Sequence, residues 1–223
     1  MQFFATALFI SLYLPSLLTA GPWPRGEGNV FLSSSAFLTW PAGRVPEAPD
    51  IYGSGFAEYG LTDRLTLGLD IGSPDYMNMD RLKAVGFVKY SLSAPEAIHQ
   101  VALDLGGGTD QGTGVIRLGA SYGRGWSLMD TPGWFTLSGV ALYAPERNEN
   151  TFGLDMTVGV SSGDMKYIAQ LSAMRAYDGA DYISVTPSAV RKIGKHLHLE
   201  IGASFGIRNK PDPALKLGIW QEF

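Results

Sequence analysis

Charged side chains occur at alternate positions in several short segments of this 223-residue chain, with apolar residues between them. Five of these side chains are carboxylates and six are bases, so their charges nearly cancel. Such a set can form a core of paired charges, because a buried charge requires a partner. It can also line a water-filled path and select the solutes that pass. The residues are Glu58, Asp70, Arg81, Lys83, Lys89, Asp104, Arg117, Asp155, Lys166, Glu200 and Lys216.

Histidine is the first residue type to consider for catalysis, and the chain has three. Hydrolysis by a nucleophile needs a base beside it, and no serine stands next to His99, His196 or His198 at a spacing typical of such a pair. On a strand, His196 and His198 would share a face with Glu200, a spacing that could hold a metal ion, although a polar turn explains it as well. The sequence therefore predicts no enzyme, no catalytic residue, no metal site and no cofactor.

The residues between the charged positions are apolar. In the clearest segment, 65–71, leucine or isoleucine occupies every odd position and a small or polar residue every even one, after a turn at 60–63. Alternation of this kind predicts β-strands. A charge that faces lipid near mid-bilayer costs about 2–4 kcal/mol, so a face this free of charge suits a membrane. A soluble sandwich would turn the same face into a dry core, and periodicity alone does not separate the two.

Alternating segments recur along the whole chain, separated by clusters of glycine, proline, asparagine and aspartate. Their spacing accommodates membrane strands of about 9–11 residues with short loops. We therefore predict an all-β fold, a closed antiparallel up-and-down transmembrane β-barrel of about twelve strands, with both termini in the periplasm. The expected strands are 29–40, 51–60, 65–72, 81–92, 97–106, 113–123, 133–143, 151–160, 165–176, 182–193, 197–207 and 214–223.

The amino end has the pattern of a secretory leader. Residues 3–18 are almost continuously apolar, and the small residue Ala20 precedes Gly21. The run is too short for a comfortable membrane-spanning helix of roughly 20 residues, and it is typical of a signal peptide. We expect a signal peptide at 1–20 and a single barrel domain at 21–223.

The composition agrees with a barrel in a membrane. Hydrophobic residues make up 45% of the chain and charged residues only 17%, below the roughly 25% that is usual in soluble domains. Cysteine is absent, although an exported soluble domain of this size often uses disulfides. The net charge of −4 predicts no nucleic-acid partner.

The carboxyl end gives the most specific resemblance. Residues 215–223 alternate strictly and end on Phe223, which resembles the closing strand of Gram-negative outer-membrane β-barrel proteins. The Gly-Leu-Thr-Asp-Arg turn at 60–64 is similar to the periplasmic turns of small porin-like and transporter-like members of that class. The resemblance implies residence in the outer membrane, contact with its lipid, and recognition of Phe223 as an assembly signal by the barrel-assembly machinery.

Three functions are compatible with such a barrel. The first, which we favour, is a narrow passive channel or transporter for small polar solutes with a mixed-charge lumen. The second is a structural or surface barrel whose interior is filled by salt bridges, with Glu58 or Asp70 paired to the strand that carries Arg81 and Lys83. The third is a lipid-modifying enzyme resembling outer-membrane phospholipase or lipid A deacylase, for which the expected histidine and serine arrangement is missing.

Overall fold

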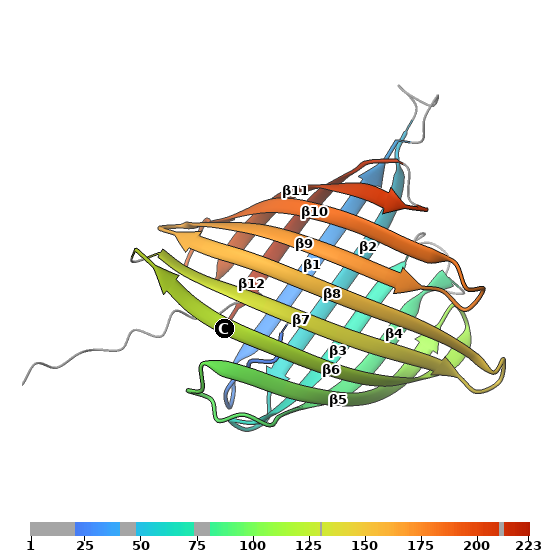
Figure 1. Cartoon of the computed structure of the whole chain (residues 1–223), viewed down its shortest axis with the longest axis horizontal. Coiled ribbons are helices and arrows are strands. Elements are labelled where there is room, and N and C mark those ends of the chain that lie inside the picture. Colours follow the sequence, from blue (N-terminus) through green and yellow to red (C-terminus); the bar gives the residue numbers. More distant parts are fainter. Residues whose placement is uncertain (1–20, 41–47, 74–80, 130, 210–211) are drawn as a thin grey trace, which may run out of the picture.

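The computed structural model describes residues 21–40, 48–73, 81–129, 131–209 and 212–223. The expected signal peptide, residues 1–20, lies outside the described residues. The described chain forms a closed barrel in which each strand pairs with the next one in sequence and β1 pairs with β12 (Figure 1). All the pairings are antiparallel. The predicted fold class and strand number are therefore confirmed.

The twelve strands follow the predicted segments closely. They are β1 (Val30–Thr39), β2 (Asp50–Gly60), β3 (Leu65–Ser73), β4 (Lys83–Ser91), β5 (His99–Asp110), β6 (Thr113–Leu128), β7 (Thr131–Ala144), β8 (Glu149–Ser162), β9 (Met165–Arg175), β10 (Asp181–Lys192), β11 (Leu197–Arg208) and β12 (Ala214–Glu222). Within the described ranges, no helix is long and apolar enough to cross a membrane.

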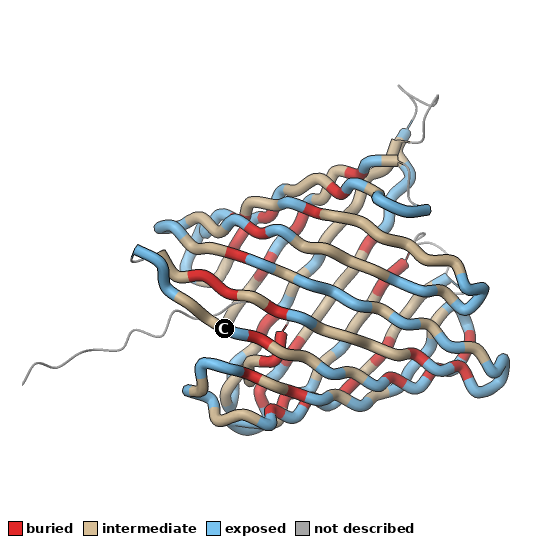
Figure 2. The backbone as a smooth tube through the Cα atoms, in the orientation of Figure 1, coloured by how far each residue is buried: buried red, intermediate tan, exposed pale blue. Residues whose placement is uncertain are grey.

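Alternation along each strand separates an apolar outer surface from a polar interior. More buried and more exposed positions alternate along the strands (Figure 2). Leucines and isoleucines of the predicted apolar parity are exposed, as at Leu67, Leu105 and Leu118. In water such a continuous apolar surface would be unfavourable, whereas lipid requires it. The apolar face is thus turned outward, and the arrangement of a soluble sandwich with a dry core is excluded.

Several strands are longer than the sequence predicts, and glycines explain the difference in β5 and β6. The predicted strand ends at Gly106, but Gly107 and Gly108 continue β5 up to a two-residue turn at Gln111–Gly112, where both residues have positive φ. β6 likewise passes through Gly123, which the pattern marks as the end of its strand. Because glycine has no side chain, it does not show which face of the strand is apolar. The alternation of apolar and polar residues is therefore lost at these glycines, although the strands continue.

The start of β1, the end of β12 and five hairpin turns share one end of the barrel, which we call periplasmic in line with the sequence prediction. The opposite end is called extracellular. Near the periplasmic end the interior is filled by apolar side chains, a feature that the sequence analysis did not predict. We call this set the periplasmic cluster. It comprises Phe31, Trp134, Ile168, Val190 and Trp220, with Trp23 and Phe56 packed against it. A smaller cluster of Val85, Val115 and Ala144 lies nearer the extracellular ends of their strands.

Candidate functional site

A cavity of about 580 Å³ occupies the barrel interior and is lined by inward-facing side chains of most strands. Most of its side chains come from the odd-numbered positions of β1, β4, β6 and β8 and from the even-numbered positions of β2, β3, β5, β7, β9, β11 and β12. Two inward-facing residues of the lining, Tyr52 and Asp155, are nevertheless exposed. Solvent therefore reaches the interior at least to their depth.

The first group of charges lies between β3 and β6. Lys83 forms an ion pair with Asp70 at 2.7 Å, which confirms the predicted pairing of Asp70 with the strand that follows it. The Arg117 guanidinium donates to Asp104 at 2.6 Å and lies 3.4 Å from Asp70. Arg117 also covers the ring of Phe87, at 4.5 Å from the centroid. Two cations and two carboxylates thus neutralise one another across four neighbouring strands.

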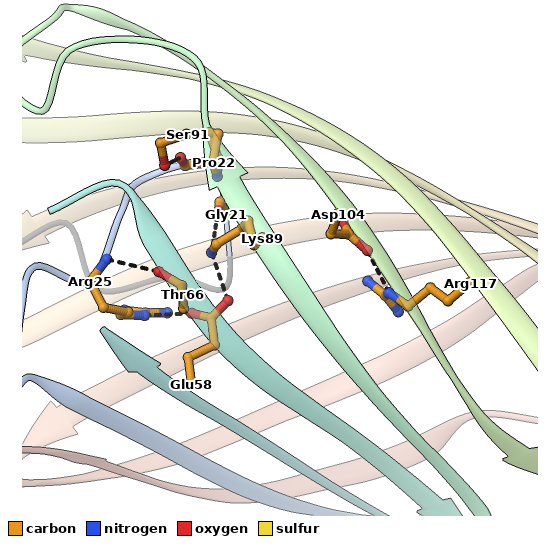
Figure 3. Close-up of polar contacts among 9 residues, drawn as sticks. All are labelled: Gly21, Pro22, Arg25, Glu58, Thr66, Lys89, Ser91, Asp104 and Arg117. Atoms are coloured by element: carbon orange, nitrogen blue, oxygen red, sulfur yellow. Dashed lines mark hydrogen bonds and ion pairs between the residues drawn. The ribbon is translucent and has the colours of Figure 1, made fainter. Parts of the chain in front are cut away.

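The second group ties the amino-terminal part of the chain to the barrel wall. The buried carboxylate of Glu58 accepts from Lys89 at 2.6 Å and from Arg25 at 2.5 Å (Figure 3). The Lys89 ammonium also donates to the carbonyl oxygen of Gly21 at 2.8 Å. All three charged groups are almost inaccessible to solvent. A buried charge that loses its partner is costly, so these contacts hold Gly21 and Arg25 inside the barrel.

Residues Gly21–Arg25, which we call the amino-terminal segment, occupy the periplasmic end of the interior. Pro22 is fully buried, and its carbonyl oxygen accepts from the Ser91 hydroxyl at 3.3 Å. The Arg25 amide donates to Thr66 at 3.5 Å (Figure 3). The Trp23 ring packs on the periplasmic cluster. The segment and the cluster thus lie together in this end of the interior.

Gly123 explains how the wall accommodates the amino-terminal segment. A Cβ atom at this position would lie 2.6 Å from the Trp23 ring and 2.7 Å from the Pro22 ring, closer than non-bonded carbon atoms approach. Gly123 is thus both the residue at which the predicted strand ends and the residue whose missing side chain leaves room for the segment.

The third group lies on the remaining strands. Glu200 accepts from Lys216 at 2.7 Å and from the Trp220 indole at 3.1 Å. Asp155 differs from the other four predicted carboxylates, because its hydrogen bonds among the described residues come from the neutral groups of Gln170 at 3.1 Å and Ser172 at 2.5 Å. The cavity thus contains one carboxylate that is oriented by neutral donors and accessible to solvent.

No protein-family model matches the chain, and no curated protein is similar enough in sequence to count as a relative. Among solved structures, a KdgM porin aligns with a TM-score of 0.62 at 8% identity, over 86% of this chain and 99% of its own. A NanC porin gives a TM-score of 0.61 at 6% identity, over 85% of this chain and 98% of its own. The KdgM porin in complex with disordered oligogalacturonate gives 0.61 at 7% identity, over 86% and 99%. Identities this low establish a shared fold and nothing finer.

The chain has the closed β-barrel fold of these outer-membrane porins. The apolar outer surface and the fold shared with these porins both indicate a barrel that lies in a membrane. The predicted localisation is therefore supported by the structure, and the polar interior is the part of the molecule in which a function specific to this protein must reside.

Eight of the eleven predicted lumen residues line the cavity, and three do not. Lys83 lies beside the cavity through its ion pair with Asp70. Lys166 points inward but lies in the periplasmic part of β9, outside the lining. The prediction that Arg81 faces the lumen is wrong. The residue lies in a short turn before β4 and is exposed, because the strand begins only at Lys83. The eight lining residues are Glu58, Asp70, Lys89, Asp104, Arg117, Asp155, Glu200 and Lys216.

Two sets of interior residues were missed. Arg25 precedes the first strand and carries no strand alternation, so no sequence signal assigns it to the interior. The inward aromatic residues were readable in principle, since Phe56 shares its parity with Glu58, and Trp220 with Lys216. The prediction of interior residues rested on the charges of this face and did not include the aromatic side chains between them.

The three histidines are not arranged for hydrolysis. The His99 ring contacts the Tyr122 hydroxyl at 2.8 Å, and that of His196 contacts the carbonyl oxygen of Glu222 at 2.5 Å. The Nδ1 atom of His198 is buried without a hydrogen-bond partner. In the described part of the chain, no group of three His, Asp or Glu side chains is placed to hold a metal ion.

Proposed function

We propose that this barrel is a narrow channel for small polar solutes, entered from the extracellular end and closed at the periplasmic end by the amino-terminal segment. The observation that carries the proposal is a cavity inside the barrel that is lined in part by polar side chains, some of which, such as Asp155, are reached by solvent. A barrel that served only as a structural element would gain nothing from such a cavity, because filling it would stabilise the fold. The porins that share the fold support a channel in preference to an enzyme.

The paired charges favour polar solutes without a strong preference for either sign. Lys89, Arg117 and Lys216 each contact at least one carboxylate. Opposite charges a few ångströms apart largely cancel in the potential that a solute experiences at a distance. The lumen therefore presents hydrogen-bonding groups and local dipoles to a solute, and no continuous row of charges of one sign.

Passage to the periplasm requires the amino-terminal segment to move. The segment is held by side-chain contacts from Glu58, Ser91 and Lys89 and belongs to no strand. Its departure would break side-chain contacts, among them the Arg25–Glu58 ion pair and the packing of Trp23, and would leave every strand pairing intact. The opening of the channel is thus separable from the unfolding of the barrel.

The second candidate is a structural barrel with a filled interior. The periplasmic cluster favours it, since Phe31, Trp134 and Val190 pack across the interior at one end. In that case the periplasmic cluster would block the interior even without the amino-terminal segment, and no solute would cross.

Planar-bilayer conductance separates the two candidates. Two refolded chains are compared, one beginning at Gly21 and one beginning at Gly26, with Glu27→Gln in the longer chain as a control because Glu27 is exposed beyond the segment. A channel predicts low or intermittent conductance for the longer chain and a higher, steady conductance for the shorter one. Silence of both chains, with both correctly folded by circular dichroism, would establish the filled structural barrel. Equal conductance of both would show that the segment does not close the path.

A further inference from the structure

The interior has two chemically different walls, and we propose that together they bind uncharged saccharides. The inference rests on the proposed function, since the solute of the channel is taken to be the ligand of its cavity. One wall is formed by β12, β1, β2 and β4 and is aromatic; the other is formed by β6–β9 and presents hydroxyl, amide and carboxylate groups. In the strand order of the barrel the two walls lie on opposite sides.

The aromatic wall consists of a connected set of four rings and a separate pair. Phe56 lies 5.9 Å from Phe87 and 6.5 Å from Phe31, and Phe31 lies 6.3 Å from Trp220. Closer to the extracellular end, Phe37 and Tyr52 pair at 6.4 Å. The six residues all line the cavity. An aromatic face attracts groups with a partial positive charge, and the C–H face of a pyranose ring is such a group.

The opposite wall is a regular array of hydrogen-bonding side chains. One row of register partners crosses it through Ser121, Ser138, Asp155 and Ser172. The neighbouring row toward the periplasm runs through Thr136, Thr157 and Gln170. All seven residues line the cavity, and no aromatic residue of β6–β9 is among its described lining residues. Hydroxyl groups both donate and accept hydrogen bonds, so the array can match hydroxyls in many orientations.

A sugar ring matches both walls at once, because it has an apolar face and a rim of hydroxyl groups that donate and accept. The cavity volume of about 580 Å³ lies within the range of roughly 300–1,000 Å³ that is usual for pockets that hold small ligands. Asp155, oriented by Gln170 and Ser172, is placed to accept from a ligand hydroxyl. An apolar solute would leave this wall unpaired, at a cost for each buried polar group.

The charges of the lumen argue for an uncharged ligand. An acidic sugar is recognised by cations that can pair with its carboxylate, and the three lining cations of the strands, Lys89, Arg117 and Lys216, already contact carboxylates of the protein. An acidic ligand would have to displace one of these partners, and it would approach Asp155 with a charge of the same sign. The oligogalacturonate complex named for one structural neighbour therefore does not define the ligand class of this chain.

Calorimetric titration of the refolded chain beginning at Gly21 tests the inference without requiring transport. The detergent must be sugar-free, for example an amine oxide, because alkyl maltosides present the ligand chemistry themselves. Maltose is the uncharged probe and digalacturonate the acidic one. We expect saturable binding of maltose in the millimolar range and at least about tenfold weaker binding of digalacturonate, a difference equivalent to 1.4 kcal/mol.

Tyr52 and Tyr59 provide a matched pair of variants. They lie on the same strand with nearly equal exposure, 43% and 44%, but Tyr52 faces the cavity and Tyr59 faces lipid. Tyr52→Ala and Ser172→Ala should each weaken maltose binding several-fold, while Tyr59→Ala should leave it unchanged. An equal loss in Tyr59→Ala, or digalacturonate binding as tight as that of maltose, would overturn the inference.

Solute flux separates this inference from the proposed function. The chain beginning at Gly26 is placed in liposomes, and swelling in arabinose reports whether small polar solutes cross. Flux without maltose binding would overturn the saccharide inference and leave the channel. Maltose binding without flux or conductance would support the binding site and contradict the channel.

Discussion

The Lys89 ammonium on β4 donates a hydrogen bond of 2.8 Å to the carbonyl oxygen of Gly21, although 68 positions separate the two residues in the chain. The same ammonium pairs with the buried carboxylate of Glu58, which also accepts from Arg25 (Figure 3). The amino-terminal segment is thus held by a charge cluster of two cations and one carboxylate. Its stability in the interior depends on the charge of Glu58.

Glu58→Gln should release the amino-terminal segment. The change keeps the shape of the side chain but leaves Arg25 and Lys89 close together without their carboxylate, and removal of one partner from a buried ion pair costs about 3–5 kcal/mol. Arg25 can relieve this cost by leaving the interior, because it belongs to no strand. Mass spectrometry after brief trypsin treatment should detect rapid cleavage after Arg25 in the variant and slow cleavage in the wild type.

Lys89→Met is the informative comparison for this cluster, since it leaves Glu58 paired with Arg25. The change removes the contact to Gly21, but the remaining charges, Glu58 and Arg25, still neutralise each other. Cleavage after Arg25 should therefore rise less than in Glu58→Gln. Asp63→Asn, in the exposed turn after β2, should behave as wild type. Equal cleavage in all four proteins would contradict the proposed hold on the segment.

Gly123→Ala should displace the segment by a different route. Its methyl group would meet the rings of Trp23 and Pro22 at 2.6 and 2.7 Å, and overpacking of this kind typically costs about 1–3 kcal/mol. We expect higher bilayer conductance than in the wild type and faster cleavage after Arg25. Gly114→Ala, on the same strand but with no atom within 4 Å of the added carbon, serves as the control, and an unchanged conductance in both variants would count against the closing role of the segment.

Much of the fold could be predicted because lipid enforces a simple pattern. A two-residue period with one face free of charge is sufficient to locate strands, and the segment 65–71 illustrates it: Leu67 and Leu69 are exposed while Asp70 lines the cavity. Prediction failed where the pattern lacked side chains. Gly106–Gly108 interrupt the alternation of β5 although the strand continues through them.

The site was predicted only as far as neighbouring strands determine it. Asp70 and Lys83 come from adjacent strands, so alternation and strand order were sufficient to bring them together. The contact of Gly21 with Lys89 joins a segment without periodicity to a distant strand, and no local signal encodes it. The aromatic wall was missed for another reason, because membrane barrels are expected to have polar interiors.

Arg117→Ala and Lys83→Ala should differ in stability although each removes one cation. Arg117 is buried against Asp104, so its loss leaves a buried carboxylate without a partner and should cost about 3–5 kcal/mol. Lys83 is partly exposed, and ion pairs of that kind contribute about 0–1 kcal/mol. Urea unfolding in detergent, followed by tryptophan fluorescence, measures the difference.

Lys83→Ala should also make the channel more selective for cations, because Asp70 keeps only its longer contact to Arg117. The measurement is the reversal potential in a potassium chloride gradient, with the chain beginning at Gly26. Arg81→Ala provides the control, since Arg81 is exposed before β4 and does not line the cavity. A shift of the same size in Arg81→Ala would show that charge near the mouth sets the selectivity, whereas no shift in Lys83→Ala would contradict a role for this pair.

Phe223→Ala should reduce assembly in cells more than the stability of refolded protein. The Phe223 backbone closes the seam of the barrel through two hydrogen bonds of 3.0 Å with Val30, and alanine retains both. The ring is 58% exposed, so its loss should cost less than the roughly 1.5–3 kcal/mol of a fully buried side chain. Recognition of the ring by the assembly machinery, which we expect from the terminal strand, would be lost nonetheless. Phe205→Ala, an outward-facing ring within β11, is the control. Outer-membrane levels are compared at equal expression, and normal levels of Phe223→Ala would contradict the assembly signal.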